Sequence, residues 1–385
     1  MLKTNIVDLE LQNWTIEQRR HFHMYPELSG QEYKTAEYVI ERLKEFGLSP
    51  DMHFSAPNVV ARFQGTEGKR TIALRADMDA LPLQEDEDKP CVSTIPGVMH
   101  GCGHDGHTAI LLAAAKWMTA NAKMIKNNIV FIFQSSEEES PSGAKKLVEE
   151  GVLNGVDAIY GIHLMSDVPL GKIGFAEGFA MASSDDFDII IEGVGGHGGQ
   201  PQDAIDPVYI STHLIQAFQS VVSRSLHPLH AGVISIGGMQ AGHSYNVIPH
   251  EVKIQGTIRA MTFDAAQMMY EKTEQLTKSI CASFGAIGHY QYTPGTPPVY
   301  NHPEACEVAK KVIIETFGED AFTELQPSMG AEDFGFYVKE KIGAFINVGM
   351  KSEISQYPHH HPKFDIDEAA LPAGIKLMIQ LALKG

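Results

Sequence analysis

The sequence has few cysteines, few basic residues and no long apolar run, and each shortage excludes a class of protein. Four cysteines in 385 residues are too few to stabilise a chain of this length by disulfide bonds, so we expect reduced thiols. An acidic residue, Asp8, stands where a signal peptide needs an apolar stretch. Together these features predict a cytoplasmic protein.

The charge and hydropathy of the chain exclude further classes of binding partner. There are 30 Lys and Arg against 48 Asp and Glu, which gives a net charge of −18 at pH 7. A nucleic acid or an anionic membrane surface needs a basic face, so we expect neither as a partner. The longest apolar run, residues 109–115, is far shorter than the ~20 residues of a membrane span. Hydrophobic residues make up 43% of the chain, which is enough for a substantial core.

The order of expected helices and strands changes twice along the chain. Before residue 183 helices and strands alternate, which is typical of an α/β sandwich. The strands expected there are residues 58–63, 71–76, 128–133 and 157–164, and the helices are residues 15–25, 31–46, 110–118 and 144–150.

From residue 184 the expected order becomes β-α-β-β-α-β, which fits a ferredoxin-like unit. Its strands are residues 186–192, 232–237, 252–259 and 289–292, and its helices are residues 206–222 and 264–283. A linker at residues 293–298 follows, and the α/β pattern then resumes with a helix at 303–317 and a strand at 344–348. We therefore predict one domain in two parts, residues 1–183 and 298–385, with a second domain inserted at residues 184–297.

The densest cluster of chemically active side chains is His100-Gly-Cys102-Gly-His104-Asp105-Gly-His107. It offers a thiol, imidazoles and a carboxylate within a few residues, and its glycines allow the backbone to bend around a ligand. Cysteine and histidine are preferred ligands of zinc and of other borderline divalent metals. With 18 histidines in the chain, this cluster predicts a metal site, although a Gly-rich turn with incidental histidines is the alternative.

Two acidic clusters each follow an expected strand. One contains Asp77 and Asp79, and the other is Gln134-Ser-Ser-Glu137-Glu138-Glu139. In the second, one glutamate is suited to binding a metal and a neighbour to acting as a general base toward a metal-bound water. Taken alone, either cluster also fits a solvated acidic loop.

Two further groups of histidines are candidates. Three consecutive histidines, residues 359–361, lie near the C-terminus, and His163 ends an expected strand. Each group alone is as compatible with a polar surface or a structural role as with metal binding.

Taken together and in this order, the clusters resemble those of the dinuclear metallo-aminoacylase and carboxypeptidase family. The most specific pieces are Arg75–Pro82 and Met99–Thr108, which are similar to the branch of hippurate hydrolases, N-acyl-amino-acid amidohydrolases and auxin-conjugate hydrolases. The resemblance runs from His23 to Glu368. It implies a zinc-peptidase-like α/β/α catalytic domain with an inserted ferredoxin-like α+β lid and dimerisation domain.

The resemblance also implies a site for two divalent ions, with manganese, zinc, cobalt and nickel all open. In this family pattern Cys102 would bind or bridge the metals, and Asp79 would steady a ligand or the base. The register set by Pro362 and Phe364 selects the middle one of the three histidines. The other implied ligands are His104, Glu138, His163 and His360.

Glu137 is the implied general base when the acidic cluster is counted from Gln134. Counting back from Gly143 leaves Glu138 and Glu139 as the alternative pair. We prefer the first register because the base must lie close to the end of the preceding strand.

The inserted segment carries a resemblance of its own. Gly195-Gly-His197-Gly-Gly-Gln-Pro201 is similar to a family segment whose histidine stabilises the oxyanion, often in the active site of a partner subunit. Asn246 and Arg259 match an Asn and an Arg of the family, which implies that they bind the free α-carboxylate of an N-acyl amino acid. A homodimer or a higher homo-oligomer is implied as well.

The implied reaction is metal-dependent hydrolysis of the amide bond of an N-acyl amino acid, for example an N-acetyl or benzoyl compound. Its products are a carboxylic acid and a free amino acid. A dipeptidase or carboxypeptidase of the same family is the alternative, and the cysteine motif favours the first. An inactive amide-binding relative and a metal buffer are further hypotheses, but ligands ordered from residue 102 to residue 360 favour a folded catalytic site.

Overall fold

The computed structural model describes residues 6–86 and 88–385, which divide into two compact units. Unit 1 comprises Met1–Gly178, Tyr300–Gln326 and Asp333–Gly385, and unit 2 comprises Phe179–Val299 and Pro327–Glu332. Most of the N-terminal segment on which the signal-peptide expectation depends lies outside the described residues. Within the described residues, every helix is too short or too polar to cross a bilayer.

The centre of unit 1 is a seven-stranded sheet with the order β1-β3-β2-β4-β15-β5-β14. Strands β3, β2, β4 and β15 are parallel, and β1 pairs antiparallel with β3 at one edge. Because the four inner strands are covered on both faces, they are rich in buried Val, Ile and Phe. Their bounds, with those of the outer strands, are β1 Val59–Phe63, β2 Thr71–Asp77, β3 Asn128–Gln134, β4 Ala158–Pro169, β5 Ile173–Phe175, β14 Phe322–Glu324 and β15 Gly343–Lys351.

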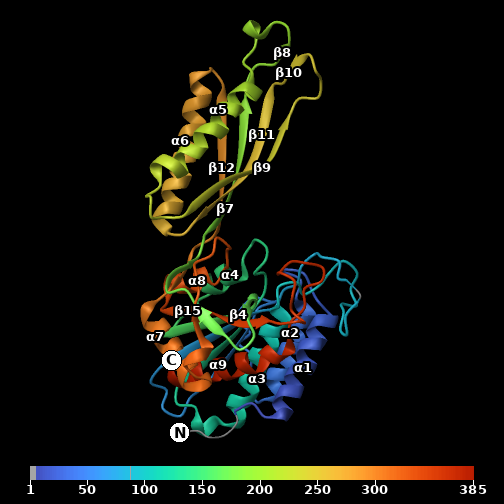
Figure 1. The fold of residues 1–385 in the computed structure, drawn as a ribbon, viewed down its shortest axis with the longest axis vertical. Helices are drawn as coiled ribbons and strands as arrows, with labels where there is room; N and C mark the ends of the chain where they lie inside the picture. Colours follow the sequence, from blue (N-terminus) through green and yellow to red (C-terminus); the bar gives the residue numbers. More distant parts are fainter. Residues whose placement is uncertain (1–5, 87) are drawn as a thin grey trace. The chain divides into compact units, whose positions relative to one another are not determined.

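Helices pack on this sheet in the α/β arrangement that the sequence predicts (Figure 1). The central one is α3, whose residues from His104 to Ala115 are all buried. Gly103 precedes it with φ +91°, a conformation that favours glycine, so the chain turns sharply from the cysteine loop into the helix. The helices of unit 1 are α1 Leu9–Met24, α2 Tyr33–Glu45, α3 His104–Ala120, α4 Gly143–Glu149, α7 Pro303–Phe317, α8 Gly335–Glu340 and α9 Leu371–Lys384.

Unit 2 is a four-stranded antiparallel sheet, β12-β7-β11-β9, with helices α5 and α6 (Figure 1). Along β7, Phe187, Ile189 and Ile191 are buried and pack in one core with residues of both helices. The order confirms the predicted ferredoxin-like unit. Its elements are β7 Ser184–Glu192, β8 Gly196–His197, α5 Pro207–Ser220, β9 Gly232–Ala241, β10 Val247–Ile248, β11 Glu251–Ala260, α6 Phe263–Ser283 and β12 Ile287–Thr296; β6 (Gly178–Met181) and β13 (Val299–Asn301) lie where the chain passes between the units.

The structure corrects several expected bounds. Helix α3 begins six residues before the expected residue 110, because the buried histidines of the cluster already form its first turn. The segment expected to be a linker, residues 293–298, is largely strand: β12 continues to Thr296. The prolines and glycine suggested a loop, but the strand pairs with β7 through a register shift that accommodates them.

Candidate metal centre

The candidate site lies where the carboxyl ends of the central parallel strands meet the start of α3. Strand β2 ends at Asp77, β3 ends at Gln134, and His163 lies on β4 beyond the residues that pair with β2. Because parallel strands end at the same edge of a sheet, residues far apart in sequence meet there. The loop that contains His360 joins them, with the His360 amide donating to Gly101 O at 2.9 Å.

His104 has one ring nitrogen in use and one without a partner. Its Nδ1 is 3.1 Å from Asp79 Oδ1, whereas the buried Nε2 has no hydrogen-bond partner among the described residues. That Nε2 lies 3.8 Å from Asp77 Oδ2 and 3.9 Å from Glu138 Oε1. Burial lowers the pKa of His104, but the surrounding carboxylates outweigh it and raise the pKa to about 10. An imidazole steadied by a carboxylate, with its other nitrogen free among negative charges, is suited to a metal ion.

Cys102 and His163 face each other across the same space. Cys102 Sγ is 3.6 Å from His163 Nε2, and His163 Nδ1 lies 3.0 Å from Leu164 O. A proton on Nδ1 donated to that carbonyl leaves the Nε2 lone pair directed at the thiol. Burial, reinforced by His107, holds the pKa of His163 well below its usual range, so the imidazole is neutral as a metal ligand must be.

Negative charge accumulates on the opposite side of the cluster. Glu138 Oε1 is 3.2 Å from His360 Nε2, and that contact raises the pKa of His360. Desolvation of the half-buried Cys102 thiol raises its pKa well above its ordinary value, and the charges of Glu138 and Glu137 add to this effect. A divalent cation would relieve both effects, since it neutralises the carboxylates and stabilises the thiolate.

The neighbouring histidines are already occupied. His107 Nδ1 is 2.7 Å from Asp77 Oδ1, and its Nε2 accepts from the Leu164 amide at 2.9 Å. His359 Nε2 donates to Leu164 O at 2.9 Å. His361 stacks on Tyr357, with ring centroids 4.8 Å apart. Of the C-terminal run, His360 alone faces Cys102 and Glu138, in a left-handed backbone conformation with φ +62°.

The sequence-predicted ligands are contained in three groups of ligand atoms that share members, each group with its atoms within 4.8 Å of one another. All five sequence-predicted ligands and Glu137 belong to them. A thiol, three imidazoles and carboxylates form a donor set that fits borderline divalent metals. The groups are Cys102, His104 and His163; Cys102, Glu138 and His360; and His104, Glu137 and Glu138.

Asp79 lies behind the donors rather than among them. Its Oδ2 accepts from the amides of Glu137 and Glu138, both at 2.9 Å, and from Ser29 Oγ at 2.7 Å. Its other oxygen contacts His104. Asp79 thus connects a ligand to the glutamate loop, as the predicted steadying carboxylate would.

Two buried networks that sequence reasoning missed support the site. Asp333 accepts from Arg75, Gln134 and Ser142, and so joins both ends of the glutamate loop. Behind α3, Asp105 Oδ2 lies 2.9 Å from Arg19 Nε and 2.8 Å from His23 Nδ1, and His23 Nε2 lies 2.8 Å from Glu85. The adjacency of Asp105 to His104 was the only local signal, because the partners come from distant segments.

The three remaining predicted residues lie in unit 2. His197 on β8 pairs with Val247, and Gly198 donates to Asn246 O at 2.8 Å, so His197 and Asn246 are neighbours. Arg259 is near the far end of β11, eight residues after Glu251, or roughly 25 Å at ~3.3 Å per residue. Because Asn246 precedes β10, at the end of unit 2 where β8 and β10 lie (Figure 1), one chain does not bring Asn246 and Arg259 together.

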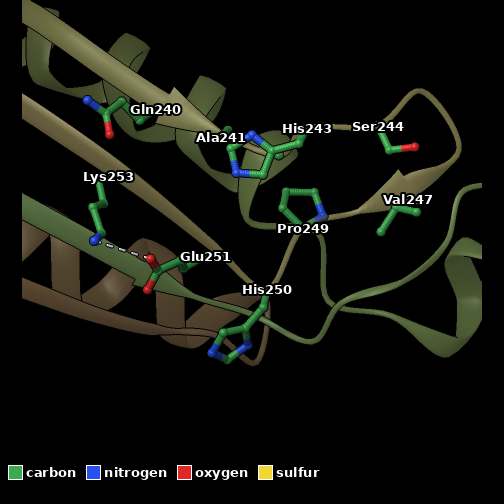
Figure 2. A pocket seen from close by; sticks show the side chains of 10 residues that line it. Gln240, Ala241, His243, Ser244, Val247, Pro249, His250, Glu251 and Lys253 are labelled. Carbon is green, nitrogen blue, oxygen red and sulfur yellow. Dashed lines mark ion pairs between the residues drawn. The ribbon is translucent and has the colours of Figure 1, made fainter.

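A hollow of about 480 Å³ lies in unit 2 between the end of β9 and the start of β11 (Figure 2). His243, Ser244 and His250 line it, with an ion pair of 3.4 Å between Glu251 and Lys253. Among the described residues, none of the groups of converging metal-ligating atoms includes these side chains. The hollow contains none of the predicted site residues.

An α/β unit with a cluster of metal-ligating side chains at its strand ends, joined to a ferredoxin-like unit, defines a class of metallohydrolase. A family model, peptidase family M20/M25/M40, matches residues 73–384. The chain belongs to this family.

Relatives that cover most of the chain belong to related hydrolases. An N-acyl-L-amino acid amidohydrolase of Geobacillus stearothermophilus is 42% identical over 295 residues, 77% of this chain and 80% of that protein. Thermostable carboxypeptidase 1 of Saccharolobus solfataricus is 36% identical over 380 residues, 97% of this chain and 96% of that protein. The solved structure of the YXEP protein of Bacillus subtilis, a dinuclear metal-binding peptidase of the family, has a TM-score of 0.85 at 34% identity and covers 98% of each chain.

Proposed function

We propose that the protein is a metal-dependent amidohydrolase that cleaves N-acyl amino acids into a carboxylic acid and a free amino acid. The observation that carries the proposal is the unpartnered, buried His104 Nε2 within a converging set of thiol, imidazole and carboxylate groups. A donor set of this kind suits two divalent ions, held by Cys102, His104, Glu138, His163 and His360. Manganese, zinc, cobalt and nickel are all candidates.

When bound, such ions supply Lewis acidity that polarises the amide carbonyl and lowers the pKa of an attacking water. Glu137 then takes a proton from that water and returns it to the leaving amine, since one glutamate serves both steps when its pKa lies near neutrality. Asp79 keeps Glu137 in place through its amide and orients His104. The alternative pair of Glu138 and Glu139 is disfavoured, because Glu139 is exposed.

Unit 2 is proposed to recognise the substrate. His197 donates to the developing oxyanion, and Asn246 and Arg259 bind the free α-carboxylate. Because His197 and Asn246 lie at the opposite end of the unit from Arg259, we propose that a partner subunit supplies the first two. The predicted lid and dimerisation domain of residues 184–297 and the catalytic parts 1–183 and 298–385 belong to the same proposal.

A homodimer through unit 2 is consistent with its open sheet edge. Strand β9 is an edge strand, and its Val233 and Met239 side chains are 40% and 43% exposed. Edge strands with apolar side chains favour pairing with another chain. Light scattering of the purified protein tests the proposed homodimer, and a monomer at the assay concentration would exclude it.

The cytoplasmic location stays a prediction from composition.

A carboxypeptidase or dipeptidase is the second candidate, favoured by the likeness to thermostable carboxypeptidase 1 over nearly the whole chain. The same metal site would serve it. The amidohydrolase and the peptidase differ in the group that carries the carbonyl of the cleaved amide bond. In the amidohydrolase it is a simple acyl group, and in the peptidase it is an amino acid or a peptide.

The deciding experiment is hydrolysis of hippurate, a panel of N-acetyl amino acids and a panel of dipeptides. Protein stripped by a chelator is assayed alone and after addition of manganese, zinc, cobalt or nickel. Release of amino acid from the N-acyl compounds only with metal supports the amidohydrolase. Turnover of dipeptides alone would support the second candidate instead, and silence from protein that binds about two ions would reject both.

A further inference from the structure

The loop that contains Glu137 is built by side chains from elsewhere in unit 1. The amides of four consecutive residues, 135–138, each donate to a side-chain oxygen. The acceptors are Asn58 for Ser135, Glu32 for Ser136, and Asp79 for Glu137 and Glu138. The position of the general base therefore depends on these three acceptors.

Glu32 is the unusual acceptor. It is fully buried, and its Oε1 accepts from the Ser136 amide at 2.7 Å while its Oε2 has no hydrogen-bond partner among the described residues. No ion pair involves it within the same residues. A buried carboxylate without a counter-charge destabilises a fold, so its presence needs another reason. Burial, and after it the charge of Asp79, raises the pKa of Glu32 to about 7, so much of the group is neutral at physiological pH.

The expected structural role of Glu32 is already filled by another residue. Glu32 stands at the N-cap of α2, but its side chain makes no capping hydrogen bond. Glu27 instead accepts from the Thr35 amide at 2.8 Å and from Thr35 Oγ1 at 3.0 Å. The Glu32 carboxyl group instead reaches the glutamate loop, through its hydrogen bond from the Ser136 amide.

The residue that Glu32 binds has a strained backbone. Ser136 has φ +51°, in the left-handed region that non-glycine residues seldom adopt. Such a conformation persists only when surrounding contacts enforce it, and it sets the direction in which the next residue leaves. The next residue is Glu137.

We propose that Glu32 is a positioning residue for the reaction: its hydrogen bond to the Ser136 amide holds the left-handed turn that directs the Glu137 carboxylate at the substrate. This inference rests on the function proposed above. It assigns no contact between Glu32 and a metal or the substrate. The hydrogen bond needs an oxygen at the position of Oε1 but no charge.

The test compares Glu32→Asp, Glu32→Gln and the wild type as metal-loaded protein. Aspartate is one methylene shorter and withdraws the oxygen from Ser136, and a misplacement of about 1 Å of this kind costs on the order of 10²-fold in rate. We expect kcat on hippurate or the best N-acetyl amino acid to fall by that factor in E32D. KM and the number of bound ions should stay as in the wild type. Glutamine keeps an oxygen in place, so E32Q should retain most of kcat.

Glu27→Asp is the matched control, because it shortens a glutamate in the same segment whose hydrogen bonds go to Thr35 of α2 and not to the glutamate loop. It should lower the thermal midpoint and leave kcat unchanged. The inference is overturned if E32D keeps its kcat, if E27D loses as much, or if the loss in E32D follows a loss of metal.

Amide hydrogen exchange separates this inference from the function itself. Exchange of residues 135–138 should quicken in E32D and not in E27D, whatever substrate the protein uses. Unchanged exchange in E32D would reject the positioning role even if no substrate is found. A wild type that is silent on every substrate, with faster exchange in E32D, would reject the proposed function and still support the part of the inference that Glu32 holds the glutamate loop.

Discussion

The candidate metal centre of unit 1 and the three predicted site residues of unit 2 are built in different ways. His104 and His163 are buried, and each has its second nitrogen in contact with an oxygen of the protein. His197 is exposed, and its Nδ1 accepts a hydrogen bond from the nearby Gly199 amide at 3.0 Å. Groups organised before substrate arrives suit tight ion binding, whereas exposed groups on a separate unit suit a substrate that must enter and leave.

The largest effect is expected from Glu137→Gln. Removing the proposed base should lower kcat by roughly 10²–10⁴-fold, because an amide cannot take and return the proton. Metal content, measured by elemental analysis, should stay at about two ions per chain. Glu139→Gln, on the exposed neighbour, is the control and should have little effect. Loss of metal in E137Q would mean that the glutamate register is shifted by one residue.

His360→Ala tests the metal centre directly. Without this imidazole one ion should bind more weakly, so that dialysed protein retains about one ion per chain and most activity is lost. His361→Ala is matched to it, because that ring stacks on Tyr357 outside the donor cluster. Equal metal content in the two variants would reject His360 as a ligand.

His197→Ala tests whether a residue of unit 2 takes part in the reaction. We expect a fall of about 10²–10³-fold in kcat with full metal content, the typical cost of losing a donor to an oxyanion. If His197 acts in the partner's site, mixing H197A with E137Q should restore part of the activity in heterodimers. Failure of the mixture, with exchange of subunits verified, would place His197 in the site of its own chain.

The smallest effect concerns stability rather than rate. Burial raises the pKa of Glu85, but hydrogen bonds from His23, Ser93 and Lys89 outweigh it and lower the pKa to about 2. The stabilisation is therefore present above the unfolded pKa of ~4.5 and is lost as the pH falls toward 2. Urea unfolding of Glu85→Gln should show lower stability at pH 6 and a shallower loss toward pH 3 than the wild type. Glu10→Gln, on an exposed carboxylate, should follow the wild type.

Much of the fold follows from local patterns in the sequence. Alternating helices and buried strands indicated the α/β unit, and the change of order near residue 184 indicated the ferredoxin-like unit. The early start of α3 and the continuation of β12 to Thr296 were missed. In both places tertiary contacts outweighed local propensity, because burial stabilised a helical turn with glycines and strand pairing accommodated a proline.

The candidate site likewise has one part that the sequence indicated and one part that it did not. Sequence order and motif register were sufficient to choose positions such as Cys102 and His104, which the structure places together, while their roles stay predictions. The sequence did not indicate Arg75, Asp333 or Glu32 as supports of the site, because each acts through a contact with residues distant in the chain.

The sequence by itself determined the family, the pattern of elements and the chemical types available to the site. Only the tertiary structure decided which nitrogen of His104 is free and how the Glu137 loop is held. The reason is physical: a motif specifies residue types at fixed spacing, whereas hydrogen-bond partners and desolvation depend on which distant segments the strand ends bring together.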